Sequence, residues 1–381
     1  MKSIPFGKPI IGDEEKNAVL DVLNGTVLAH GKKLKEFEAG FAAYAKAPAA
    51  TTVANCTAAM HLAYFCLGLK PGDEVIVPAQ THTATAHAVE LASGKAVFVD
   101  AESDTGNIDI DQIECAITDR TKAISVVHFL GMPVDMGRIN ALAKKRGLFV
   151  LEDCALAIGT KFDGIHAGLL GDIGCFSFYP VKHITTAEGG MAISNDPSII
   201  HEIDRKKAFG LDKMLGERKV PGMYDVNSLG FNYRMNEIQA AIGVEQVKRI
   251  DGFLQKRRSN YERLSEGLKQ IDEVELLKSS HDKFESSYYC HTAILKEDMA
   301  DKRIQIIENL KANGVGTSIY YPNPVPLMKY YKEKYAFKDG MFPVASKISN
   351  NSIALSVGPH LDGEDMDYIV EMLKNAIMET K

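Results

Sequence analysis

The sequence predicts an α/β protein: a large domain built on a mostly parallel mixed sheet flanked by helices, followed by a smaller C-terminal α+β domain. Three observations support this fold class. Short apolar runs alternate with helical patterns over the first two-thirds of the chain, a long helical pattern follows, and the last third lacks that regular alternation. Strands that alternate with helices form mostly parallel sheets with helices on both faces.

Six short apolar runs are predicted to be buried strands. An amphipathic segment at residues 135–145 lies between the third and fourth runs and places Ile139, Leu142 and Ala143 on one helical face. In sheets of this kind, ligands bind beyond the carboxyl ends of the strands. The predicted strands lie at residues 75–77, 96–99, 124–127, 149–151, 175–178 and 191–193.

A long helical pattern starts near Asn236 and continues to Leu268. We predict that it joins a large domain, residues 1–250, to a small domain, residues 251–381. Within the small domain the pattern predicts an apolar segment at 288–295, a helix at 301–313, a Gly/Pro-rich stretch at 314–326 and a last helix at 364–378.

The composition is that of a soluble globular protein, with 45% hydrophobic and 25% charged residues in a chain of 381. The 44 Lys and Arg against 50 Asp and Glu leave a net charge of −6, which disfavours nucleic-acid binding. No apolar stretch approaches the roughly 20 residues of a membrane helix, and no apolar signal core follows the start. The six cysteines form no C-x-x-C pair, so we expect no metal site and a cytoplasmic location.

Three segments hold residues suited to catalysis, although each one alone has a simpler structural interpretation. Asp153 follows a buried strand and could cap the next helix. Lys182 lies in a mostly uncharged run, where it is either a solvated side chain or a desolvated, nucleophilic amine. Residues 55–60 start a helix that is either ordinary or a phosphate cradle. Together the three fit pyridoxal 5'-phosphate (PLP), which needs an amine, a carboxylate and a phosphate site.

Several separated segments carry a family resemblance. The most specific stretch is residues 171–191; Asp100, residues 127–131 and residues 230–241 agree as well. On these segments the sequence resembles the DegT/DnrJ/EryC1/StrS family of sugar aminotransferases, which have the fold type I architecture of PLP enzymes. The resemblance covers nearly the whole chain. It implies PLP as the cofactor, with pyridoxamine phosphate (PMP) as an intermediate form.

The resemblance also implies a role for each cofactor-binding position. Lys182 matches the catalytic lysine that forms an imine with the cofactor, and Asp153 matches the carboxylate on the pyridine nitrogen. Ser177 matches the hydroxyl that binds the cofactor phosphate, helped by the backbone of Thr57 and Ala58.

Asn232 matches a residue that reaches the cofactor of the neighbouring subunit, which implies a homodimer with shared active sites. Ala155 matches the small residue packed behind the ring. Two positions depart from the family pattern. His82 stands where Phe or Trp stacks on the ring, and an imidazole stacks there as a titratable group. Leu156 stands where Gln or His lies near the ring hydroxyl, and leucine cannot form a hydrogen bond.

Other polar residues are weaker candidates. The loop at residues 216–219 and Arg234 could offset the phosphate charges of a nucleotide, although Arg234 and Glu188 could equally be structural. His61 and His87 lie in apolar helices, where we expect core residues. The candidate substrate-binding residues are His183, Glu188, Arg234 and Tyr320.

The implied reaction is transfer of an amino group from L-glutamate to a nucleotide-linked 3- or 4-keto deoxysugar. One alternative is a sugar 3-dehydratase of the same family, in which histidine replaces the lysine; Lys182 disfavours it. Another is a non-catalytic regulator, which should have lost Lys182, Asp153 or Ser177. A nicotinamide dehydrogenase is disfavoured because a G-x-G-x-x-G motif is lacking after the first strand. The sugar, the nucleotide and the pathway (O-antigen, capsule, protein glycan or antibiotic) stay open.

Overall fold

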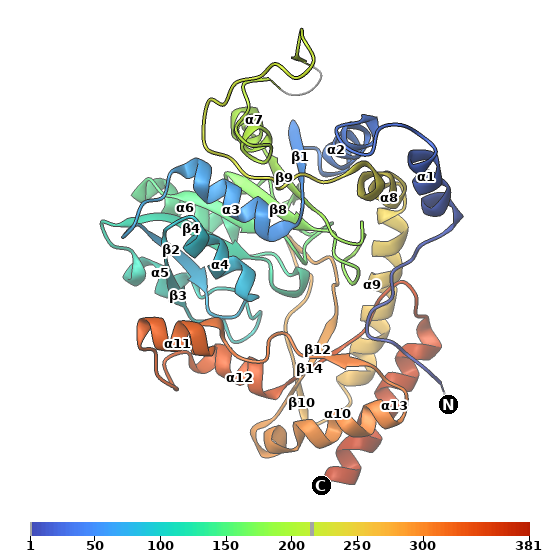
Figure 1. Cartoon of the computed structure of the whole chain (residues 1–381). Coiled ribbons are helices and arrows are strands. Elements are labelled where there is room, and N and C mark those ends of the chain that lie inside the picture. Colours follow the sequence, from blue (N-terminus) through green and yellow to red (C-terminus); the bar gives the residue numbers. More distant parts are fainter. Residues whose placement is uncertain (1, 214–216) are drawn as a thin grey trace.

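A seven-stranded sheet forms the centre of the first half of the chain in the computed structural model, which describes residues 2–213 and 217–381 (Figure 1). The strand order is β1-β9-β8-β5-β4-β2-β3. In this sheet β3, β2, β4, β5 and β8 run parallel, while β9 is antiparallel to both of its neighbours. The predicted fold class is confirmed. The strands are β1 (Ala49–Val53), β2 (Glu74–Pro78), β3 (Lys95–Val99), β4 (Thr121–Val127), β5 (Phe149–Asp153), β8 (Ile173–Ser177) and β9 (Gly190–Ser194).

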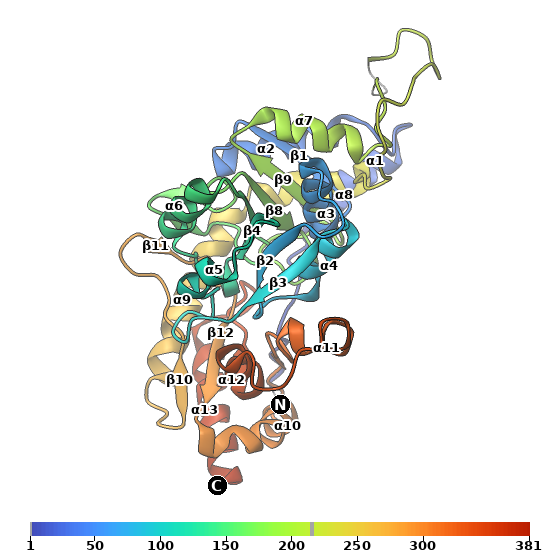
Figure 2. The same ribbon diagram turned by 90° about the vertical axis from the view of Figure 1, so that its left-hand side faces the viewer.

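Helices cover both faces of this sheet (Figure 2). Because successive side chains of a strand point to opposite faces, Val75 and Val77 pack towards α3, α4 and α7, whereas Ile76 packs towards α5 and α6. At the β1 end, α2 and α8 pack on the sheet with α1 outside them. The helices are α1 (Asp13–Leu23), α2 (Lys32–Ala45), α3 (Cys56–Leu67), α4 (Thr83–Leu91), α5 (Ile110–Ala116), α6 (Met136–Arg146), α7 (Pro197–Lys206) and α8 (Glu237–Val247).

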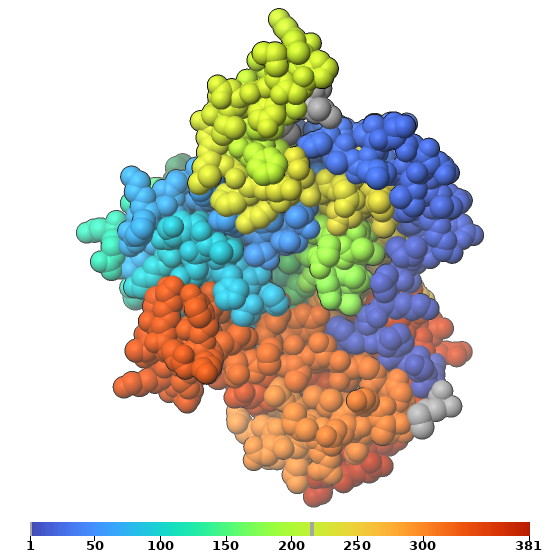
Figure 3. Space-filling view, in the orientation of Figure 1, coloured from blue at the N-terminus to red at the C-terminus, as the bar shows by residue number. Residues whose placement is uncertain are grey.

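A second, antiparallel sheet of order β10-β12-β14-β13 lies in the C-terminal half and packs on α9, α10 and α13. The start of the chain lies against this half (Figure 3). Ile4 is buried in the same core and pairs with Val315. The predicted boundary near residue 250 stays a prediction. The elements are β10 (Val274–Leu276), β12 (His291–Leu295), β13 (Thr317–Ser318), β14 (Ser352–Leu355), α9 (Ile250–Leu268), α10 (Arg303–Ala312), α11 (Lys329–Tyr335), α12 (Pro343–Asn351) and α13 (Gly363–Thr380).

A small third sheet ties the two halves together. Its order is β11-β6-β7, with β6 (Lys161–Phe162), β7 (Ile165–His166) and β11 (Phe284–Glu285). Asp100, at the end of β3, accepts hydrogen bonds from the N–H groups of Val344 and Ala345 in the first turn of α12. No helix in the two described ranges is long and apolar enough to cross a membrane.

The single long helix predicted from Asn236 to Leu268 is wrong, because the chain turns between α8 and α9. The Arg249 guanidinium at this turn donates to the Ile10 carbonyl at 2.8 Å and to the Glu15 carboxylate at 2.5 Å. The turn is therefore held by the N-terminal segment, which local helical periodicity does not report.

Candidate active site

A cavity of about 690 Å³ lies beyond the carboxyl ends of β4, β5 and β8, where the sheet topology places a ligand. The start of α3 forms one wall, and Tyr320 and Tyr321 from the C-terminal half form another. Seven of the eight residues that the sequence predicts to bind the cofactor line this cavity: Thr57, Ala58, His82, Asp153, Ala155, Ser177 and Lys182.

Asp153 ends β5 and points into the cavity with 4% of its surface exposed. One carboxylate oxygen, Oδ1, accepts from the Ala155 N–H at 3.1 Å, with the Cys56 thiol 3.9 Å away. The other, Oδ2, accepts from the Thr85 hydroxyl at 2.8 Å. These donors offset the cost of burying a carboxylate, so the group is suited to hold a protonated nitrogen.

Lys182 lies in the loop between β8 and β9, with Nζ 5.3 Å from the centre of the Tyr289 ring. Burial lowers the pKa of the Lys182 ammonium, and the nearby Cys56 and Asp153 act in the opposite direction. A lowered pKa increases the fraction of neutral amine, which is the nucleophilic form.

The start of α3 and the end of β8 form a cradle suited to phosphate. Asn55 caps the helix by accepting from the Ala58 N–H at 2.9 Å, and N–H groups of a first helical turn lack carbonyl partners within the helix. A Cβ on Gly190 would lie 2.4 Å from the Asn55 carbonyl carbon, so glycine permits β9 to approach the helix start. Ser177, 8% exposed, lines the same cavity.

His82, Ala155 and Leu156 form further parts of the wall. His82 caps α4 by accepting from the Ala84 N–H at 3.1 Å, and its ring centre lies 5.7 Å from that of Tyr321. Desolvation by the cavity wall lowers the pKa of His82. The predicted stacking of His82 on the cofactor, and the effects of Ala155 and Leu156, stay predictions.

Of the four predicted substrate-binding residues, Glu188 and Tyr320 line the cavity. The Tyr320 hydroxyl lies 2.8 Å from that of Tyr289, and its carbonyl accepts from the Gln80 amide at 2.9 Å. Glu188 is exposed, and its carbonyl accepts from the Gln239 side chain at 2.7 Å.

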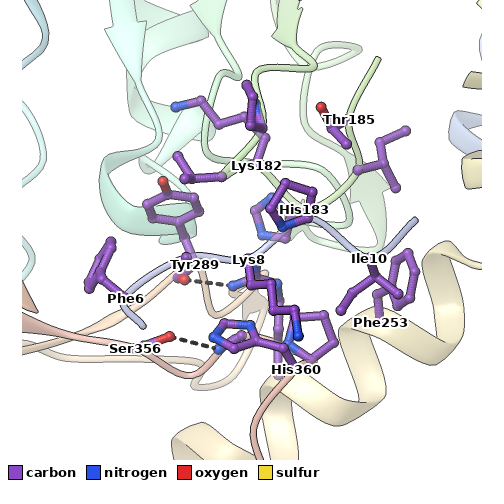
Figure 4. A pocket seen from close by; sticks show the side chains of 18 of the residues that line it. Phe6, Lys8, Ile10, Lys182, His183, Thr185, Phe253, Tyr289, Ser356 and His360 are labelled. Carbon is purple, nitrogen blue, oxygen red and sulfur yellow. Dashed lines mark hydrogen bonds between the residues drawn. The ribbon is translucent and has the colours of Figure 1, made fainter. Parts of the chain in front are cut away.

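His183 and Arg234 do not line it. His183 lines a smaller cavity of about 20 Å³ that also includes Lys182 and Tyr289 in its wall (Figure 4). Its Nε2 lies 3.2 Å from the Ser287 carbonyl, and burial, with the nearby Arg257 cation, lowers the pKa of His183 far below its ordinary value. The Arg234 guanidinium lies 5.1 Å above the Phe209 ring.

Asn232 is exposed and does not line the cavity of its own chain; its backbone pairs with Ala208. In the predicted basic loop, Gly216 lies outside the described residues. The Arg218 guanidinium packs 4.6 Å above the Tyr224 ring, and the described residues of this loop, 217–219, do not line the cavity either. The roles predicted for the loop and for Asn232 stay predictions.

Sequence reasoning missed several residues around the site. Thr85 and Tyr289, which touch Asp153 and Lys182, belong to this group. His61 is buried as expected but also lines the cavity, with Nδ1 3.2 Å from the Tyr233 hydroxyl. His87 was expected in the core and is instead exposed, because it lies on the outer side of α4 against Tyr331. At Thr85 and His61 the only signal is a polar residue within an apolar helix, and Tyr289 lies in an irregular segment before β12.

The residues fit PLP: an amine of lowered pKa, a buried carboxylate and a helix start that glycine leaves accessible all meet in one cavity. The fold and the site therefore define a PLP enzyme of fold type I.

The DegT/DnrJ/EryC1/StrS aminotransferase family matches residues 9–374, and the chain belongs to it. The chain is 36% identical over 375 residues to GDP-perosamine synthase of Escherichia coli O157:H7, covering 98% of each protein. Spr1654 of Streptococcus pneumoniae in its PMP form has a TM-score of 0.94 at 29% identity over 100% of both chains, and its PLP form has 0.93. Helicobacter pylori PseC, an aminotransferase of pseudoaminic acid biosynthesis, has a TM-score of 0.92 at 26% identity, over 99% of this chain and 100% of that one. This chain is a PLP-dependent sugar aminotransferase, with PMP as the intermediate form of its cofactor.

Proposed function

We propose that the enzyme transfers an amino group from L-glutamate to a nucleotide-linked 3- or 4-keto deoxysugar, as a cytoplasmic homodimer. The observation that carries this proposal is the placement of Lys182 and Asp153 in one cavity, with Tyr320 and Glu188 completing its wall. GDP-perosamine synthase, a relative over 98% of the chain, is named for a nucleotide-linked amino sugar and supports an acceptor of that class.

When bound, the cofactor supplies a ring that withdraws electrons from the carbon being deprotonated. The Lys182 amine would hold the cofactor covalently and, when free, would carry a proton between two carbons of the reacting centre. Asp153 holds the proton on the ring nitrogen. Ser177 and the backbone at Thr57 and Ala58 would hold the phosphate, with the Ala58 N–H also donating to the Asn55 side chain. His82 and Ala155 would contact the ring.

The test is a panel of GDP-, UDP- and dTDP-linked 3-keto and 4-keto deoxysugars, each incubated with the enzyme and L-glutamate. We expect one nucleotide-linked amino sugar, formed with one equivalent of 2-oxoglutarate and identified by mass and NMR. Conversion of free keto sugars alone, or turnover with another amino donor alone, would contradict the proposal.

A sugar 3-dehydratase is the alternative within the family, and the position of His183 bears on it. Lys182 lines both the large and the smaller cavity. His183 lines only the smaller one of these two, where its ring pairs with the Ser287 carbonyl. The panel separates the two reactions because a dehydratase releases a deoxygenated keto sugar without nitrogen. A non-catalytic regulatory protein would convert none of the sugars in the panel.

The proposal of a shared active site rests on Asn232, which is exposed and does not line the cavity of its own chain. We expect inactive Lys182→Ala subunits mixed with impaired Asn232→Asp subunits to regain partial activity, because one site of each heterodimer carries neither substitution. Heterodimers verified by mass spectrometry that stay inactive would contradict a shared site.

A further inference from the structure

The Asp153 carboxylate is held by a hydroxyl from another element. Thr85, in the first turn of α4, places Oγ1 2.8 Å from Asp153 Oδ2, and no surface of Thr85 is exposed. A second hydroxyl follows: Thr81 Oγ1 lies 2.7 Å from Thr85 Oγ1, and Thr81 is 1% exposed. Neither threonine lines the large cavity, so neither is placed to contact cofactor or substrate.

The direction of these hydrogen bonds follows from the carboxylate. An ionised carboxylate only accepts, so the Thr85 hydroxyl donates its one proton to Asp153 and accepts from Thr81. Oδ1 is held on the other side by the Ala155 N–H at 3.1 Å. Donors from the turn after β5 and from α4 therefore fix the two oxygens of a carboxylate that lines the cavity.

We propose that Thr85 is a positioning residue for the reaction: its hydroxyl holds the Asp153 carboxylate oriented towards the cofactor ring nitrogen. This inference rests on the role proposed for Asp153. Packing does not require the hydroxyl, because α4 buries apolar side chains such as Ala86 and Val89 around it and is capped by His82. Valine has nearly the same shape as threonine, so Thr85→Val removes the hydroxyl and keeps the volume.

Hydrogen bonds to charged groups are strong enough for their loss to cost about 10- to 100-fold. We expect Thr85→Val to lower kcat by this factor while KM for both substrates changes less than threefold. Without this donor the carboxylate loses its fixed orientation towards the ring nitrogen and holds the proton there less well. In ¹⁵N NMR of the enzyme with PLP labelled at the ring nitrogen, the signal should move from the pyridinium towards the pyridine position.

Three variants make the test specific to the hydroxyl. Thr85→Ser should restore kcat within about threefold and the wild-type ¹⁵N signal. Thr85→Ala and Thr85→Ser both lack the methyl group, so their difference isolates the hydroxyl even if Thr85→Val does not fold. Thr160→Val is the matched control: Thr160 is also fully buried, but its hydroxyl donates to the Gly131 carbonyl at 2.6 Å, away from Asp153. It should leave the ¹⁵N signal unchanged.

The NMR measurement needs no sugar, so it separates this inference from the proposed function. If Asp153→Asn shifts the ¹⁵N signal and Thr85→Val and Thr85→Ala do not, the role of Thr85 is overturned alone. If Asp153→Asn also leaves the signal unchanged, the role of Asp153 fails and takes that of Thr85 with it.

Discussion

Glu152 and Asp153 are neighbouring carboxylates at the end of β5, and their surroundings differ. Both are buried, at 0% and 4% exposure, and they point to opposite faces of the sheet because they are adjacent in a strand. Asp153 faces the large cavity, where its protein donors are the Ala155 N–H and the Thr85 hydroxyl. Glu152 faces the packed layer on the α6 side.

Each oxygen of the Glu152 carboxylate accepts two hydrogen bonds from the protein. Its oxygens accept from the N–H groups of Gly168, Leu170 and Gly171 at 2.6 to 2.8 Å. The fourth partner is His128 Nε2 at 2.9 Å. The Val134 N–H donates to His128 Nδ1, so the ring proton lies on Nε2 and points at Glu152. His128, Glu152 and Cys154 lie close enough to hold a metal, but this hydrogen bonding uses the imidazole and carboxylate lone pairs.

The contrast teaches how a buried charge becomes useful. A carboxylate whose acceptor sites are all occupied by the protein stabilises the fold and has no lone pair free to bind a ligand. One that keeps free lone pairs beside a cavity can bind a ligand cation. Substitutions of residues on the two sides of β5 test this division.

Removing the amine of Lys182 should have the greatest effect on the cavity side. We expect Lys182→Ala to lower kcat by roughly 10²–10⁴-fold or more, because both the covalent attachment and the proton carrier are lost. Borohydride should then trap no adduct with PLP. Lys278→Ala, at an exposed position, is the control and should keep full activity. Near-native turnover by Lys182→Ala would mean that another lysine does the work.

Asp153→Asn should separate catalysis from stability. The amide keeps the shape but loses the charge, and loss of one electrostatic partner of a reacting group costs about 10²–10³-fold. We expect kcat to fall by this factor while the midpoint of thermal unfolding moves by only a few degrees. Unfolding at much lower temperature, with kcat unaffected in the folded protein, would assign Asp153 to the fold instead.

Glu152→Gln should instead lower stability and leave kcat nearly unchanged. An amide group would turn one donor towards the backbone N–H groups that Glu152 now satisfies. We expect the free energy of unfolding to fall by about 3 kcal/mol, measured by urea denaturation with PLP bound, because buried charged hydrogen bonds are lost. The folded fraction should keep kcat within about threefold. A large loss of kcat at unchanged stability would erase the distinction between the two carboxylates.

A gentler effect should come from His166, which lies on the packed side near Glu152 and accepts from the Gly159 N–H at 3.0 Å. Burial lowers the pKa of His166 to about 4, whereas an unfolded histidine titrates near 6.5. The unfolded chain therefore binds more protons between these values, so stability is complete above pH 6.5 and is lost as the pH falls towards 4. The loss approaches about 1.4 kcal/mol per pH unit.

The measurement is urea denaturation at pH 7, 6 and 5. His166→Gln does not titrate, so its stability should decline less steeply over this range than that of the wild-type protein. Equal slopes for the two proteins would show that His166 does not carry the effect.

Local patterns predicted much of the fold because they report short-range physics. The apolar run at 149–151 lies within β5, and Asp135, at the start of the predicted amphipathic helix, caps α6. The strand β1 was missed because its sequence, AATTV, is only partly apolar. The break between α8 and α9 was not predicted, because the contact at this turn joins Arg249 to Glu15, and all strands of the large sheet lie between these residues in the sequence.

Local sequence was enough to identify the residues with the chemistry for PLP: Lys182, Asp153 and the helix start before Thr57 are recognisable in short segments whose spacing and order are characteristic. The side chains that surround and tune these residues became visible only in three dimensions. Thr85 reaches Asp153 across 68 positions of sequence, and Tyr289 lies beside Lys182 from the other half of the chain. The tertiary structure also placed Lys182 in the wall of the large cavity, whereas its neighbour His183 shares only the smaller cavity with it. The physical reason is that a side chain's pKa and hydrogen bonds depend on what surrounds it in space, and those surroundings come from segments that local sequence cannot bring together.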